Sequence, residues 1–248
     1  MQGCKIKMRT VRICQYQAKL ELNTPLTLDE DGFGHLIRVL RFNKDDEFVV
    51  FDGLGHEYEA VLTEAGKNAT YVCTKEIARN VESPVFVELG QVISRGDKME
   101  FTIQKAVELG IGEITPLYSS RCGVKLDEKR QQKKVEQWQK IAIAACEQCG
   151  RNVVPKVNDI TDISKWYDAA PDALSITLDP KADTRLSALE IPSKLRLLIG
   201  PEGGLSEEEI DKAAQSGFKG VTLGPRILRT ETAALAALSI LGCTYGDL

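Results

Sequence analysis

Two short glycine-proline turns near the C-terminal end of the sequence carry residue types that can hold a small ligand. The first is residues 200–204 (Gly-Pro-Glu-Gly-Gly), and the second is residues 223–233, which begins with Leu-Gly-Pro and contains Arg229 and Thr230. Each turn ends a short apolar run, because proline cannot continue a central strand. Glycines let backbone N–H and C=O groups approach a ligand closely, and open α/β sheets bind ligands beyond their strand ends. We therefore expect the two turns to form the floor of a ligand site.

A helix is expected after each turn. Ser206 and Glu209 have the spacing of a capping box, which predicts a helix start, and Gly217 is a suitable helix end. Residues 233–241 are almost wholly apolar, which predicts a helix that is buried on most sides. A strand before each turn and a helix after it would fix the backbone of the turn.

The elements that position these turns alternate between strands and helices from residue 85 onward. Asp97 and Glu100 predict a capped helix that ends at Gly110, and an apolar stripe predicts a long helix over residues 128–148. We expect strands at residues 85–93, 111–117, 153–157, 174–178, 195–199 and 221–223. This alternation predicts an α/β fold with a mostly parallel sheet covered on both faces.

The N-terminal part has the pattern of a separate β-rich domain. Short runs of β-forming residues lie at 11–14, 47–51, 57–62 and 70–75, which can close a small barrel but cannot make a doubly wound sheet. A helix over residues 34–42 would place His35, Arg38 and Arg41 on one face. That face is either a phosphate-contacting surface or a polar outer face. A polar Ser-Pro stretch at residues 79–84 predicts the domain boundary.

Composition places the chain among ordinary globular proteins. Its 248 residues are 43% hydrophobic and 27% charged, and the formal net charge is −4. Local basic patches occur nevertheless: residues 1–19 hold five basic and no acidic side chains, and residues 121–140 hold seven basic against three acidic ones. Such patches either contact phosphates or face water. No run has the length of a membrane span, no signal-peptide core is visible, and the seven cysteines form no disulfide pattern, so we expect a cytoplasmic protein.

Several common chemistries are not indicated. No G-x-G-x-x-G motif follows a strand, and the 200–204 turn lacks the lysine of a phosphate-binding loop. Both histidines lie in the N-terminal part, which excludes a Ser-His-Asp triad or a histidine metal site in the C-terminal part. Cys146 and Cys149 have zinc-ligand spacing without a second ligand pair, so helix-end packing is favoured and no metal is expected.

The two turns and several further motifs resemble one family. They are similar to those of bacterial 16S rRNA uracil-N3 methyltransferases of the SPOUT superfamily, and the similarity covers nearly the full length. The matching segments are residues 200–204, 223–233, 93–100 (Ile-Ser-Arg-Gly-Asp-Lys-Met-Glu), 104–110, 121–125, 147–151, 35–41 and 51–53.

The resemblance implies two domains and a cofactor. Residues 1–78 would form a PUA-like β-barrel that binds RNA, and residues 79–248 an α/β SPOUT methyltransferase domain with a C-terminal trefoil knot. The protein would be a homodimer that binds S-adenosylmethionine and acts on 16S rRNA or the small ribosomal subunit. The implied cofactor-binding residues are Leu178, Ile199, Gly200, Pro201, Glu202, Gly203, Gly204, Leu223, Gly224, Ile227, Leu228, Thr230, Thr232 and Ala233.

Methylation of uracil N3 requires an exposed base, loss of the N3 proton and stabilisation of the negative charge that remains. Arg229, inside the second turn, is the first candidate for a cation that stabilises this charge; its alternative is a salt bridge to Glu231 or Glu202. Glu202 is a second catalytic candidate, as a base or a positioning group; its alternative is to complement a helix dipole.

Basic side chains throughout the chain are candidates for phosphate contacts. The RNA-binding candidates are Arg9, Arg12, His35, Arg38, Arg41, Arg95, Lys98, Arg121, Lys125 and Arg151. Two other functions remain open: a SPOUT methyltransferase that modifies a ribose 2′-hydroxyl or another base in rRNA or tRNA, and a non-catalytic RNA-binding assembly factor.

Overall fold

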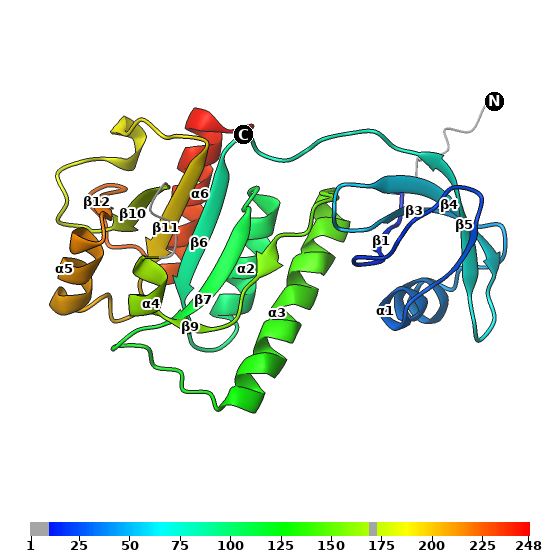
Figure 1. Ribbon diagram of the computed structural model, residues 1–248, viewed down its shortest axis with the longest axis horizontal. Helices are drawn as coiled ribbons and strands as arrows, with labels where there is room; N and C mark the ends of the chain where they lie inside the picture. Colours follow the sequence, from blue (N-terminus) through cyan, green and yellow to red (C-terminus); the bar gives the residue numbers. More distant parts are fainter. Residues whose placement is uncertain (1–9, 169–172) are drawn as a thin grey trace, which may run out of the picture. The chain divides into compact units, whose positions relative to one another are not determined.

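The computed structural model describes residues 10–168 and 173–248, which divide into two compact units (Figure 1). Unit 1 consists of the chain up to Val81 together with Cys146–Val154, and unit 2 of Glu82–Ala145 together with Pro155–Leu248. Arg9 lies outside the described residues. Unit 1 is therefore assembled from two stretches that are far apart in the sequence.

Unit 1 contains a five-stranded sheet with the order β1-β3-β4-β5-β2. The pairing is antiparallel except between β1 and β3, which run parallel. Four of these strands match the predicted β-forming runs, whereas β2 begins at a proline and was not predicted. The strands are β1 (Arg12–Cys14), β2 (Pro25–Thr27), β3 (Glu47–Phe51), β4 (Glu57–Glu64) and β5 (Thr70–Glu76).

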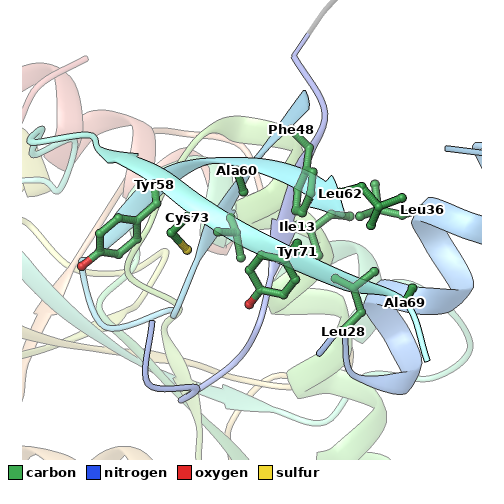
Figure 2. Close-up of a cluster of buried hydrophobic side chains, with 11 residues drawn as sticks. Ile13, Leu28, Leu36, Phe48, Tyr58, Ala60, Leu62, Ala69, Tyr71 and Cys73 are labelled. Carbon is green, nitrogen blue, oxygen red and sulfur yellow. The ribbon is translucent and has the colours of Figure 1, made fainter. Parts of the chain in front are cut away.

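Buried side chains from the strands and from the helical region form the core of unit 1 (Figure 2). Along β4, Tyr58, Ala60 and Leu62 are buried and the intervening Glu59 is exposed, as expected for a strand with one buried face. Phe48 packs edge to face on Tyr71, with ring centroids 5.6 Å apart.

The helical region of unit 1 differs from the predicted helix over residues 34–42. A short helix, α1 (Glu30–Phe33), passes into a π-helix, η1 (Gly34–Val39), in which Leu40 N–H donates to His35 O at 3.0 Å. Arg41 lies beyond the end of η1 with φ 58°. The prediction that one helix presents His35, Arg38 and Arg41 on a single face is therefore wrong, because the wider π turn changes the spacing and the helix ends before Arg41.

Hydrogen bonds join the two stretches of unit 1. Arg12 donates from Nη2 to Arg151 O at 3.1 Å, and Cys14 N–H donates to Glu147 Oε1 at 2.9 Å. Gly55 N–H donates to the backbone carbonyl of Asn152 at 3.1 Å. Residues 146–154 therefore belong to the folded structure of unit 1.

Unit 2 is built on a sheet whose described pairings are all parallel, which confirms the predicted sheet type. The order is β12-β10-β11-β6-β7-β8, and β9 also pairs with β7. Only two residues of the predicted strand over 153–157 form β8, and β12 ends two residues before the predicted 223. The strands are β6 (Phe86–Val92), β7 (Glu113–Tyr118), β8 (Lys156–Val157), β9 (Thr161–Asp162), β10 (Leu174–Leu178), β11 (Lys194–Ile199) and β12 (Lys219–Val221).

Helices cover both faces of this sheet (Figure 1). α4 packs against α5, and their side chains meet Leu198 of β11 on one face. α2 packs against α6, and α6 also contacts β11, which places these helices on the opposite face. The helical elements are α2 (Lys98–Glu108), α3 (Glu128–Cys149), α4 (Ile163–Tyr167), the 3₁₀ helix η2 (Leu186–Ala188), α5 (Glu207–Gln215) and α6 (Thr230–Tyr245).

The helix ends of unit 2 test the predicted caps. The capping box of Ser206 and Glu209 is present at the start of α5, and Gly217, with φ 85°, follows the end of that helix. Asp97 precedes α2 as predicted but makes no side-chain capping hydrogen bond. Its backbone is already helical (φ −85°, ψ −2°), whereas a capping side chain requires an extended residue, so this predicted cap is wrong.

A buried charge lies on the α4 face of the sheet. Arg196 of β11 is 1% exposed, and its guanidinium stacks on Trp166 at 3.9 Å from the ring centroid. Arg196 Nε lies 3.2 Å from Glu88 Oε2, and Trp166 Nε1 donates to Glu88 Oε1 at 2.7 Å. Arg196 Nη1 also donates to Tyr167 O at 2.9 Å. The arginine thus attaches α4 to two neighbouring strands.

Candidate functional site

The first turn follows β11 and is held in a tight conformation. Gly204 N–H donates to Pro201 O at 2.9 Å, and Gly204 has φ 67°, which favours glycine. A Cβ at Gly200 would lie 3.1 Å from Leu205 Cγ, so this position also favours glycine. Because β10, β11 and β6 run parallel, the turn lies at the edge where open α/β sheets bind ligands.

The second turn follows β12 and is held by its own threonine and by a neighbouring loop. Gly224, with φ 143°, donates its N–H to Thr222 Oγ1 at 3.2 Å. Thr222 N–H donates to Thr184 O at 2.9 Å, and Leu186 N–H donates to Thr222 O at 3.1 Å. The segment after β10 therefore supports the second turn.

Thr230 joins the two turns. Its Oγ1 donates to Gly200 O in the first turn at 2.7 Å and accepts a hydrogen bond from Gln91 Nε2 at 2.9 Å. Thr230 is the first residue of α6, so this contact fixes the start of α6 against the end of β11. Gln91 is fully buried on β6, 139 residues from Thr230. Sequence reasoning missed it; a glutamine in an apolar strand is the signal that could have indicated a role.

The charged candidates Lys98 and Glu202 also lie at this junction. Lys98 Nζ is 3.6 Å from Glu202 Oε1 in the first turn and 3.8 Å from Glu231 Oε2 at the start of α6. Glu202 Oε1 accepts the backbone N–H of Arg95 at 3.1 Å. Burial opposes ionisation, but hydrogen bonds from the backbone N–H groups of Glu202 and Arg95 and the charge of Lys98 together lower the pKa of Glu202.

Arg121 and Arg95 contact backbone near the first turn. Arg121 Nη1 donates to Gly203 O at 3.1 Å and to Leu205 O at 3.2 Å, so an expected RNA contact is also a support of the turn. A Cβ at Gly123 would overlap the guanidinium of Arg95, which shows that this side chain lies directly on the backbone there.

Arg229 precedes α6 in extended conformation (φ −66°, ψ 155°), and its side chain is exposed. Within residues 10–168 and 173–248 it forms no ion pair, whereas Glu202 and Glu231 both lie near Lys98. Arg229 O accepts the N–H of Ala233 at 2.7 Å. Arg229 is therefore the residue at the N-terminus of α6, and no described acid forms an ion pair with it.

The two turns fit a ligand held mainly by backbone groups. A Cβ at Gly204 or Gly224 would meet no atom within 4 Å, yet the positive φ at both positions disfavours side chains. Open space beside a glycine lets a ligand approach the backbone closely. Of the other expected cofactor residues, Ile199 and Pro201 are buried, Leu178, Leu223, Leu228 and Ala233 are half-buried, and Gly203, Ile227 and Thr232 are exposed.

The basic candidates of unit 1 divide into exposed and paired side chains. His35, Arg38 and Arg41 are exposed. Arg12 instead forms an ion pair with the buried Glu57, and burial together with the nearby Arg79 lowers its pKa to about 10. Arg151 is buried. In unit 2, Arg95, Arg121 and Lys125 are exposed.

Comparison with known proteins assigns the family. One family model, described as an RNA methyltransferase domain, matches residues 81–242, and another, described as an RNA methyltransferase PUA domain, matches residues 28–72. The chain belongs to this RNA methyltransferase family. The assignment confirms the predicted combination of a SPOUT-type α/β domain and a PUA domain.

Relatives within the family match nearly the whole chain. The ribosomal RNA small subunit methyltransferase E of Buchnera aphidicola from Schizaphis graminum is 38% identical over 92% of this chain and 94% of its own length. The protein of that name from Bacillus subtilis is 34% identical over 84% and 85%.

Solved structures of family members share the fold. A putative methyltransferase from Legionella pneumophila, in complex with the cofactor SAM, is 38% identical, has a TM-score of 0.93, and covers 97% of this chain and 100% of its own. A ribosomal RNA small subunit methyltransferase E from Neisseria gonorrhoeae, bound to S-adenosyl methionine, is 36% identical with a TM-score of 0.90 and the same coverage.

The described residues show neither a membrane-spanning helix nor a cluster of metal ligands. No helix there has the length and apolar character that a membrane crossing requires. The described part of the chain also holds no group of three or more His, Cys, Asp or Glu side chains placed to bind a metal ion. Cys146 is buried and Cys149 is exposed at the end of α3.

Proposed function

We propose that this protein transfers a methyl group from S-adenosylmethionine to N3 of a specific uridine in 16S rRNA of the small ribosomal subunit. The observation that carries the proposal is the hydrogen bond from Thr230 Oγ1 to Gly200 O, which brings the two glycine-proline turns together. The SAM complexes of the Legionella and Neisseria family members support the choice of cofactor. The names of the Buchnera and Bacillus relatives support the choice of substrate.

The cofactor is proposed to lie over the two turns, in contact with the residues from 199–204 and 223–233 and with Leu178. When bound, S-adenosylmethionine supplies an electrophilic methyl group on a sulfonium centre. The chain contributes open space beside the backbone at Gly204 and Gly224, where a Cβ would meet no atom within 4 Å. Thr230 and Gln91 keep the turns at the correct separation through their hydrogen bonds.

Thr230→Val is expected to weaken S-adenosylmethionine binding about tenfold, because it removes the hydroxyl that joins the turns and leaves Gly200 O without this donor. Isothermal titration calorimetry measures the affinity. Thr244→Val, at the exposed far end of α6, is the matched control and should bind normally. Equal affinity of Thr230→Val and wild type would contradict the role of the hydroxyl.

Arg229 is proposed to stabilise the charge that develops on the uracil when N3 loses its proton. That charge spreads over N3 and the two carbonyl oxygens, and a fixed cation beside them lowers the barrier. Arg229 is exposed and immediately precedes α6, and the dipole of this helix also favours negative charge at its N-terminus.

Glu202 is proposed to position the site rather than to remove the N3 proton. Its lowered pKa makes the carboxylate a weak base, and its oxygen already accepts the N–H of Arg95. The carboxylate thereby holds the loop after β6 against the first turn. Glu202→Gln should therefore keep the pH dependence of the rate.

The proposal also covers the roles of the two domains, the oligomeric state, the cellular location and the knot. Residues 1–78 are proposed to act as the RNA-binding domain and residues 79–248 as the methyltransferase domain, in a cytoplasmic homodimer. The C-terminal part is proposed to form a trefoil knot. In support of the knot, Thr222 pairs with residues 184–186 through two backbone hydrogen bonds, and Thr230 at the start of α6 then bonds to Gly200.

Electrostatic RNA binding gives a measurable salt dependence. Removing two phosphate contacts with the double variant Arg38→Ala, Arg41→Ala should lower the slope of log affinity against log salt by about 1.5. Filter binding to 16S rRNA at several salt concentrations measures the slope. Lys75→Ala, a charge paired with Glu59 on the same unit, is the control. An unchanged slope for the double variant would exclude these two arginines.

The function itself is tested by incubating the protein with labelled S-adenosylmethionine and either naked 16S rRNA or assembled small subunits. Mass spectrometry of the nucleosides should show 3-methyluridine. A 2′-O-methyl nucleoside or another methylated base would establish the rival enzyme, and absence of both methyl transfer and cofactor binding would favour an assembly factor.

A further inference from the structure

The end of η1 exposes two neighbouring apolar side chains. Val39, the last residue of η1, is 70% exposed, and Leu40, which follows it, is 40% exposed. In the described part of unit 1, no large apolar side chain is more exposed than Val39. Isolated apolar residues are common on protein surfaces, whereas two in succession at a helix end form a small apolar patch. We call residues 38–41 (Arg-Val-Leu-Arg), which hold this pair between two arginines, the tip.

The backbone on both sides of the tip is fixed. Leu36 is fully buried in the core of unit 1 (Figure 2), and Phe42 N–H donates to Leu36 O at 2.9 Å. Arg41 lies in the left-handed region with φ 58°, and its carbonyl accepts a hydrogen bond from Asn43 Nδ2 at 3.2 Å. π-Helices and non-glycine residues in this region both cluster at functional sites. A rigid backbone presents the tip, which lowers the entropy cost of binding a partner.

The charges around the apolar pair are all positive. Arg38, Arg41 and Lys44 are exposed, and residues 32–44 contain no Asp or Glu. Among the ion pairs of the described residues, none involves these three side chains. The Arg38 guanidinium lies over the Phe33 ring, 5.2 Å from its centroid, which restricts its motion but leaves its charge unpaired. The tip therefore complements a partner that carries negative charge beside apolar surface.

Single-stranded RNA has both properties. Each nucleotide combines a negative phosphate with a base whose flat faces are apolar. In an RNA duplex these faces are stacked on one another, and the major groove is too deep and narrow for side chains to reach the bases. Short side chains such as valine and leucine can therefore cover a base face only where the nucleotides are unpaired.

We propose that the tip binds an unpaired segment of the RNA substrate. Val39 and Leu40 pack against the face of an exposed base, and Arg38 and Arg41 contact the phosphates on either side of it. This inference rests on the proposed function, which makes rRNA the substrate, and it specifies which form of RNA unit 1 recognises. The arginines supply affinity for any RNA, whereas the apolar pair supplies the preference for unpaired nucleotides.

Binding of two RNA probes tests the proposal without turnover. The probes are a labelled hairpin with a pyrimidine loop and a fully paired duplex of the same length, and fluorescence anisotropy measures their affinities. Wild type should bind the hairpin more tightly than the duplex. Val39→Ser should weaken hairpin binding about tenfold, because the base loses its apolar cover. Its duplex affinity and the salt dependence of binding should not change, because the variant keeps every charge.

Val39→Tyr tests the contact in the opposite direction. It should bind the hairpin at least as tightly as wild type, because a tyrosine ring stacks on a base. Leu40→Ser should weaken hairpin binding by a smaller factor than Val39→Ser, since Leu40 is less exposed. Leu22→Ser is the matched control, because Leu22 is 44% exposed on the same unit but follows the acidic Glu21. It should bind both probes as wild type does.

Three results would overturn the proposal. The first is equal affinity of wild type for the two probes, and the second is normal hairpin binding by both Val39→Ser and Leu40→Ser. The third is normal hairpin binding by these variants with loss of binding to assembled small subunits, which would assign the tip to a ribosomal protein. Failure of the proposed function is distinguishable, because it appears as absence of 3-methyluridine with the wild-type protein.

Discussion

Arg229→Ala is expected to lower the rate of methyl transfer by about 100- to 1,000-fold and to leave the affinity for S-adenosylmethionine within about twofold of wild type. The reason is that the exposed Arg229, which precedes α6, has no described ion-pair partner, so its loss removes charge stabilisation without releasing a structural contact. Single-turnover kinetics with rRNA and calorimetry with the cofactor measure the two quantities.

Arg226→Ala provides the control for this experiment. Arg226 is exposed in the same turn, three residues before Arg229, so the two variants remove the same charge from neighbouring places. Arg226→Ala should retain nearly normal turnover. Arg229→Lys should recover only part of the activity, because a lysine keeps the charge without the planar fork of donors. Near-normal turnover of Arg229→Ala would remove the residue from the mechanism.

Glu88→Ala is expected to lower the free energy of unfolding by about 3 kcal/mol, because it leaves the buried charge of Arg196 without its counterion. The change also removes the acceptor of Trp166 Nε1. Urea denaturation followed by circular dichroism measures the effect. The double variant Glu88→Ala, Arg196→Met should be closer to wild type than Glu88→Ala, since it removes both charges.

A partly exposed ion pair in the same unit is the control for the buried one. On α2, Glu108 Oε1 lies 2.7 Å from Lys105 Nζ. The side chain of Glu108 is 29% exposed and that of Lys105 is 35% exposed. Glu108→Ala should change stability by less than about 0.5 kcal/mol, because water screens such a pair. If Glu88→Ala cost no more than Glu108→Ala, the buried network would have no special role in stability.

Local signals in the sequence were sufficient for much of the fold. The Ser206–Glu209 capping box marks the start of α5, and Gly217 follows its end. Both signals depend only on residues close together in the sequence, so residue spacing was enough to predict the position of this helix. Features that depend on backbone conformation could not be predicted from residue types and spacing. The π-helix at Gly34–Val39 has the composition of an ordinary helix, and Asp97 has the type of a cap but a helical backbone.

The site residues that could not be predicted from the sequence have partners that are far away along the chain. The types and spacing of the glycine turns indicated a ligand site because glycine and proline act locally. Gln91 contacts Thr230 across 139 residues, and no spacing in the sequence can show such a contact. Arg12 was expected to bind phosphate because its charge was visible in the sequence, whereas Glu57, its partner, lies 45 residues away.

The divided origin of unit 1 has a consequence for synthesis on the ribosome. Residues 147–152 supply three of the acceptors that the earlier part of unit 1 requires, namely Glu147 Oε1 and the carbonyls of Arg151 and Asn152. The unit therefore cannot close when residue 81 is made, and the nascent chain waits roughly 4–15 s for residue 154 at translation rates of 5–20 residues per second. By then β6 and β7 have already been translated, so part of unit 2 is synthesised before unit 1 can close.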